Sequence, residues 1–122
     1  MDYSKMSDVD MSREVAKALK LPWSWNGGKT VFVADDTAIG RHSFDPCNNP
    51  ADAWPIIVES GISINHYNGV WEASFEWDAP VGAFGTEETV TTSTEHKNPL
   101  RAAMVAYLMM REVNNVQTDS TR

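Results

Sequence analysis

Two acidic residues and a histidine stand close enough along the chain to suggest acid–base chemistry. Asp35 and Asp36 follow a short apolar run, and His42 comes six residues after Asp36. A carboxylate and an imidazole can form a general acid–base pair, and a turn after a strand is a common place for one. Neighbouring aspartates on an extended chain point apart, however, and solvated loop acids give the same pattern. A small enzyme that uses Asp35, Asp36 and His42 is therefore the interpretation that we favour least, and we assign no catalytic residue.

A predicted helix is preceded by the polar run Asp45-Pro46-Cys47-Asn48-Asn49. Its side chains can donate and accept hydrogen bonds, and a helix start adds free backbone amides. Turn formation and capping alone account for Asp45 and one of the two asparagines. We treat Asp45, Asn48 and Asn49 as candidate ligand-binding residues beside that structural explanation.

Two tryptophans in a glycine-rich turn, Trp23 and Trp25, are also candidate binding residues. They could stack on a base or ring, or they could cover the end of a sheet, which is the simpler interpretation. A nucleotide-like ligand would also need cations for its phosphates. That hypothesis assigns this role to Lys29, Arg41 and Arg101.

Two sets of residues suggest a phosphate loop and a zinc site, but their spacing matches neither motif. The segment Gly27-Gly28-Lys29-Thr30 resembles the end of a phosphate loop, but Trp23 stands where that motif needs its first glycine. The three histidines and the lone Cys47 have none of the spacings of zinc ligand pairs. We therefore expect neither a cofactor nor a bound metal.

Charge is distributed unevenly along the chain. The formal net charge is -7, and residues 45–95 contain nine acidic side chains and no lysine or arginine. Proteins that bind nucleic acid neutralise its phosphates with clustered Lys and Arg. We therefore expect no direct nucleic-acid binding, and we expect the acidic middle region to face a basic surface on another protein.

The lengths of the apolar runs, the first residues and the cysteine content restrict where the protein can act and how many domains it can form. No apolar run approaches the roughly 20 residues of a membrane span, and the first residues lack the basic flank and apolar stretch of a secretory signal. The lone Cys47 cannot form an internal disulfide. We expect a cytoplasmic protein without a membrane partner, with one domain over 1–115 and a polar tail over 116–122.

Capping residues and apolar periodicity predict three helices. They begin or end at residues typical of helix boundaries: Ser7 and Pro22 for the first, Asn49 and Gly61 for the second, and Asn98 and about Glu112 for the third. In the second helix we expect Trp54, Ile57 and Val58 to face the core. Pro55 is expected to bend this helix.

Alternation of apolar and polar residues predicts the strands. A short strand is expected over 30–34, a hairpin over 62–77 that turns at Asn68-Gly69, and an edge strand over 89–94. The segment 23–28 is interpreted as a turn, and 35–44 and 79–87 as loops. In the hairpin, Trp71 and Phe75 are expected on the buried face.

The last helix is apolar on nearly all sides between Leu100 and Met110. Such a helix must be sandwiched within the domain or paired with another subunit. We predict an α+β fold, a three-layer α-β-α sandwich whose small, mostly antiparallel sheet has helices on both faces. We also predict a homodimer with this helix at or beside the interface.

Three blocks of the sequence carry a resemblance to a known family: Asp2-Tyr3-Ser4, residues 44–64, and Asn98-Pro99-Leu100-Arg101-Ala102-Ala103-Met104. With these blocks the chain resembles the NinX family of small proteins from tailed bacteriophages and, more loosely, the phage α-β-α sandwich domain. The resemblance implies a three-layer fold and a phage or prophage origin, and we expect the protein in the host bacterial cytoplasm. It implies no catalytic residues, because the activity of that family is unknown.

Three functions remain open from the sequence. The favoured one is a non-catalytic accessory protein whose acidic region binds a host protein. The second is sequestration of a nucleotide-like host signal in a dimer pocket, and the third is the small enzyme.

Overall fold

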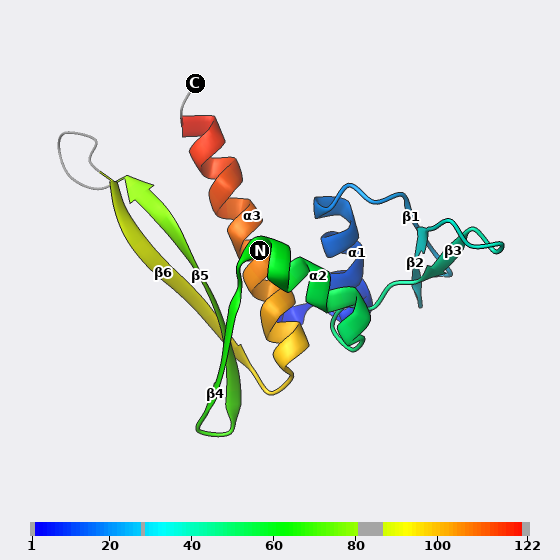
Figure 1. The fold of residues 1–122 in the computed structure, drawn as a ribbon, viewed down its shortest axis with the longest axis horizontal. Coiled ribbons are helices and arrows are strands. Elements are labelled where there is room, and N and C mark those ends of the chain that lie inside the picture. The colour runs from blue at the N-terminus through cyan, green and yellow to red at the C-terminus, as the bar shows by residue number, and fades with distance from the viewer. Residues whose placement is uncertain (1, 28, 81–86, 121–122) are drawn as a thin grey trace.

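The fold belongs to the α+β class, as predicted. The computed structural model describes residues 2–27, 29–80 and 87–120, and these contain three α-helices and two antiparallel sheets of three strands each. The helices lie between the two sheets (Figure 1). The prediction had one sheet with helices on both faces. The layers differ because two short strands missing from the prediction join the strand predicted over 30–34 to form a sheet of their own.

The helices begin where local capping chemistry predicts. They are α1 (Asp8–Ala18), α2 (Pro50–Ser60) and α3 (Pro99–Ser120), preceded by the short 3-10 helix η1 (Tyr3–Lys5). The side chain of Ser7 accepts a hydrogen bond from the third residue of its helix segment, Asp10, and that of Asn49 accepts one from Ala51. Each of these bonds satisfies an amide that the helix itself leaves unpaired.

The ends of α2 and α3 differ because the sequence carries a helix stop signal after α2 and none after Glu112 in α3. Gly61 caps α2 with φ of 69°, a left-handed conformation that glycine adopts without a steric penalty. The sequence placed the end of the last helix near Glu112, but α3 continues to Ser120. No glycine or proline follows Glu112 to stop it, so the backbone of 116–120, predicted as part of a tail, is helical.

The first sheet consists of β1 (Trp23–Trp25), β2 (Val31–Ala34) and β3 (Arg41–Ser43), with β2 in the centre. Of these strands only β2 was predicted. The other two lie in segments interpreted as a turn and a loop. Both are three residues long and exposed, so pairing with β2 rather than an apolar pattern makes them strands. Gly28, in the predicted turn, lies outside the described residues.

The second sheet consists of β4 (Ser63–Tyr67), β5 (Val70–Pro80) and β6 (Glu87–His96), with β5 in the centre. The predicted hairpin turn is confirmed: Asn68 and Gly69 have φ of 50° and 78°. The predicted loop over 79–87 was placed too widely, because Ala79 and Pro80 belong to β5 and Glu87 to β6. Residues 81–86 of that loop lie outside the described residues.

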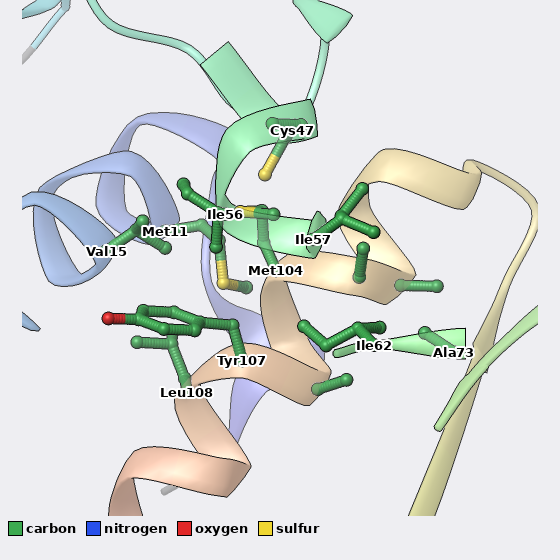
Figure 2. Packing of buried hydrophobic residues seen from close by; sticks show 14 of the residues in the cluster. Met11, Val15, Cys47, Ile56, Ile57, Ile62, Ala73, Met104, Tyr107 and Leu108 are labelled. Atoms are coloured by element: carbon green, nitrogen blue, oxygen red, sulfur yellow. The ribbon is translucent and has the colours of Figure 1, made fainter. Parts of the chain in front are cut away.

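The core gathers around α3 (Figure 2). Met104, Tyr107 and Leu108 of α3 pack with Met11 and Val15 of α1, with α2 and with the second sheet. Enclosure by these elements accounts for the apolar character of α3 on nearly all sides. Val105, Met109 and Met110 of α3 nevertheless remain partly exposed, and the homodimer stays a prediction.

The buried faces of the second sheet and of α2 can be compared with the prediction. Phe75 of β5 is 3% exposed and Trp71 is partly buried, as predicted. On α2 the prediction was wrong for two residues, because Trp54 is 62% and Val58 58% exposed. The helix turns Ala53, Ile56 and Ile57 inward instead, and Trp54 and Val58 share its opposite face.

Candidate functional site

The second sheet carries a polar face opposite the face that packs on α3. Successive side chains of a strand point to opposite sides, and directly paired residues share a side. Pairing of Glu72 with Glu95, of Glu76 with Thr91 and of Asp78 with Thr89 therefore groups the carboxylates on one face. We call the following residues the acidic face: Tyr67 of β4, Glu72, Glu76 and Asp78 of β5, and Glu95 of β6.

Two carboxylates of the acidic face oppose each other directly. The hydroxyl of Tyr67 lies 3.1 Å from Glu72 Oε2 and 2.8 Å from Glu95 Oε1. The hydrogen bond to Glu95, with burial and Glu72 adding to it, raises the pKa of Tyr67 to about 12. A phenol has one proton and can donate it to only one carboxylate at a time. Like charges directly opposite destabilise a strand pair, so this arrangement favours an added cation.

Three of the four carboxylates of the acidic face, those of Glu72, Glu76 and Glu95, take part in no ion pair within the part of the chain that the structure describes. The sequence supplies no lysine or arginine between residues 45 and 95 that could reach them from the same sheet. These carboxylates therefore remain available to a positively charged partner.

The predicted aromatic residues lie together at the edge of the first sheet. The rings of Trp23 and Trp25 meet edge to face with centroids 6.0 Å apart, and both are partly exposed. Arg13 of α1 places its guanidinium carbon 4.9 Å from the centroid of the Trp25 ring. One ring of the pair therefore already contacts a cation of the chain itself.

The predicted cations are dispersed. Arg41 lies over Phe32, with its guanidinium carbon 4.4 Å from the ring centroid. The strand register places Trp23 on the same side as Val33 and His42, and Arg41 on the other side with Ala34. Arg41 and the tryptophans therefore face opposite sides of the first sheet.

A predicted cation and a predicted carboxylate come together beside α1. Lys29 and Asp45 line a depression of about 240 Å³ beside the start of α1, together with Asp8. The depression contains both charge signs, so its residues can balance one another without a ligand.

Arg101 is a structural residue of α3. It is 9% exposed, and its guanidinium donates hydrogen bonds to Asp8 Oδ1 at 2.5 Å, to the carbonyl of Tyr3 at 3.0 Å and to that of Met6 at 2.6 Å. These acceptors join the N-terminal segment to α3. The guanidinium is thus occupied and is not directed at a ligand phosphate.

Asp8, which the sequence did not single out, links Arg101 to the predicted polar run. Burial alone would raise the pKa of Asp8, but the hydrogen bonds from Asn48 and Arg101 outweigh burial and the pKa is lowered. Asn48 Nδ2 lies 3.1 Å from Asp8 Oδ2 and 3.0 Å from Asp45 Oδ2. The only local sequence signal for Asp8 was its place in the first turn of a helix, where an acid is favourable.

The remaining member of the polar run, Asn49, caps α2, so capping accounts for its side chain. Its neighbour Cys47 is buried, and burial, with a smaller contribution from Asp8, raises the pKa of its thiol to about 12. A thiol that stays protonated is a poor nucleophile. No group of three or more metal-ligating side chains occurs in the described part of the chain.

The acid–base pair is present at the β2–β3 connection. His42 Nδ1 lies 2.7 Å from Asp35 Oδ2, whereas Asp36 is exposed and has no such contact among the hydrogen bonds of the described residues. The amide and hydroxyl of Thr37 donate to Asp35 Oδ1, and these bonds, with a smaller one from His42, lower the pKa of Asp35. The Thr37 bonds close the turn, which gives Asp35 a structural role without chemistry.

The sequence model of one family, described as Bacteriophage P22, NinX, matches residues 2–111. No curated protein matches the chain. None of the described helices is both long and apolar enough to cross a membrane.

Proposed function

Because the chain belongs to the NinX family of bacteriophage proteins, and is thus a phage accessory protein, we propose that it is a non-catalytic module that binds a basic surface of a host protein. It acts in the cytoplasm of the bacterial host. The acidic face of the second sheet is the binding surface. The observation that carries this proposal is the direct opposition of Glu72 and Glu95, neither of which takes part in an ion pair of the described residues.

Electrostatics supports a protein partner at this face. Opposed carboxylates repel each other, and a lysine or arginine from a partner relieves that repulsion while it forms charge-assisted hydrogen bonds. Nucleic acid would instead add negative charge to an acidic surface. The partner is therefore a protein with clustered basic side chains.

The two other functions have less support. A nucleotide-like ligand would need the tryptophans and phosphate-binding cations in one place, yet Arg101 is occupied inside the fold and Arg41 faces the other side of its sheet. The enzyme hypothesis has the contact between Asp35 and His42, but Asp35 is already used by the turn. Neither arrangement carries a proposal as well as the acidic face does.

The test is capture of host proteins by the purified chain and by two matched variants. Glu72→Gln/Glu95→Gln removes two charges from the acidic face, and Asp10→Asn/Asp36→Asn removes two charges elsewhere. We expect a basic host protein to co-purify with the wild type and the control variant, and to be lost with Glu72→Gln/Glu95→Gln. Thermal unfolding shows that all three proteins are folded.

Mass spectrometry of the same samples decides between the hypotheses. A retained nucleotide without a retained protein would contradict the proposal and support the sequestration hypothesis. Equal capture by the two variants would also contradict it, because the partner would then not depend on the acidic face.

A further inference from the structure

We infer that the hollow at the C-terminal end of α2 accepts the charged end of one arginine or lysine side chain from the partner. The inference rests on the proposed function and assigns an anchoring contact to it. The hollow has a volume of about 330 Å³. Its lining comes from four elements: Ser60 and Gly61 at the end of α2, Ser63 of β4, Ser74, Phe75 and Glu76 of β5, and Thr91 of β6.

The hollow opens on the acidic face. Ser63 is paired with Ser74, and Glu76 with Thr91, so these side chains share the side of the sheet that carries the carboxylates. A water molecule occupies about 30 Å³, so the hollow has room for the end of a long side chain and for bridging waters. A partner bound to the acidic face can therefore reach into it.

The charge of the hollow selects a cation. Glu76 supplies a carboxylate, and none of the ion pairs of the described residues involves it. The C-terminal end of α2 adds the negative end of a helix dipole. The described lining includes no basic side chain. An anion would find no compensating positive charge there.

The donor and acceptor pattern suits a guanidinium or ammonium group better than a metal ion. Magnesium and calcium take several carboxylate or carbonyl oxygens, whereas the hollow offers one carboxylate and several hydroxyls. Hydroxyl oxygens and a single carboxylate can accept the multiple N–H donors of an arginine or lysine. The hydroxyls of Ser63, Ser74 and Thr91 are the acceptors that complement Glu76.

The probe for this site is Nα-acetylarginine methylamide, with the neutral isostere Nα-acetylcitrulline methylamide as its control. Amide NMR spectra of the isotope-labelled chain are recorded as each probe is added to about 50 mM, because one ion pair gives weak affinity. We expect the arginine probe to shift the amides of Ser60, Gly61 and Ser74 most strongly. The citrulline probe is expected to leave them nearly unchanged.

Matched variants separate the hollow from the rest of the sheet. Glu76→Gln should weaken binding of the arginine probe at least about threefold, a loss of about 0.7 kcal/mol. Glu88→Gln removes one exposed charge of the same sheet outside the hollow and should leave the binding unchanged. Equal shifts with both probes, or equal affinity in the two variants, would overturn the inference.

The inference and the proposed function can fail separately. If a host protein requires Glu72 and Glu95 but the arginine probe does not shift the hollow, the inference is wrong and the proposed function stands. If the probe binds the hollow but no host protein depends on the acidic face, the inference is supported and the proposed function is wrong.

Discussion

The two sheets of this protein have the same number of strands and use charge in opposite ways. At the first sheet, Arg13 of α1 lies over Trp25 and Arg41 of β3 lies over Phe32, and His42 contacts Asp35. In the second sheet, Glu72 and Glu95 are directly paired, and the hydroxyl of Tyr67 lies within hydrogen-bond distance of both. Charges satisfied internally stabilise or position local structure, whereas charges left opposed favour a partner. The comparison therefore directs the search for function to the second sheet.

The largest expected effect is a difference in stability between two variants, each of which removes a phenylalanine from the central strand of one sheet. Phe75→Ala removes a fully buried side chain of β5 and should lower the free energy of unfolding by about 3–5 kcal/mol. Phe32→Ala in β2 affects a partly exposed ring and should cost about 1 kcal/mol. Urea unfolding of both variants measures the difference. Similar losses would mean that the first sheet is packed as tightly as the second.

A buried and a surface guanidinium provide the next comparison. Arg101→Met leaves Asp8 Oδ1 and two backbone carbonyls without the guanidinium that donates to them and should cost about 2 kcal/mol. Arg41→Met loses only an exposed contact with Phe32 and should cost about 0.5 kcal/mol. Calorimetric unfolding of the two variants checks this order. A stable Arg101→Met protein would refute the structural role of Arg101.

The start of α3 is expected to give a smaller loss. Asn98 Oδ1 accepts from the amide of Leu100 at 2.9 Å, and Asn98 Nδ2 donates to the carbonyl of Cys47 at 2.8 Å. Asn98→Ala should therefore lower the free energy of unfolding by about 1 kcal/mol. Thermal unfolding measures the loss. An unchanged transition would show that these two bonds contribute nothing.

The lowered pKa of Asp8 predicts a dependence of stability on pH. A carboxyl whose pKa is lower in the folded state contributes stability above its unfolded pKa of about 3.9, and that contribution is lost as the pH falls through the folded pKa. The stability difference between wild type and Asp8→Asn should thus be largest near neutral pH and shrink below about pH 4. Urea unfolding at several pH values measures it, with Asp36→Asn as the control. A difference that does not change with pH would contradict the assignment.

The smallest expected change is a shift in the pKa of Tyr67, which lies in the acidic face. The pKa of Tyr67 is raised to about 12 by Glu95 and Glu72. Glu72→Gln/Glu95→Gln should move that pKa toward the ordinary value of about 10. NMR of the Tyr67 ring at high pH follows this shift. No change in the double variant would place the two carboxylates away from the hydroxyl.

Local chemistry allowed much of the fold to be predicted. The caps at Ser7, Asn49 and Asn98, the glycine end of α2 and the Asn68-Gly69 turn depend on neighbours within a few residues. Such signals can be read from the sequence because the partner of each side chain is close along the chain.

Features that depend on distant partners were missed or misread. Strands β1 and β3 exist because they pair with β2, and Trp54 is exposed because Ile56 and Ala53 take the inner side of α2. The charge imbalance of 45–95 was evident, but the contact between Glu72 and Glu95 depends on the register of β5 with β6. The role of Arg101 likewise depends on Asp8, 93 positions away along the chain. Contacts between residues far apart along the chain leave no local pattern from which they could be predicted.

The salt dependence of partner binding tests the central claim most directly. The affinity of the captured host protein is measured by calorimetry at ionic strengths from about 0.05 to about 0.5 M, a range over which exposed charges become screened. We predict at least about a tenfold loss of affinity for the wild type and for Asp10→Asn/Asp36→Asn. For Glu72→Gln/Glu95→Gln we predict weaker binding with a smaller dependence on salt. The same affinity at every ionic strength in all three proteins would contradict binding through the acidic face.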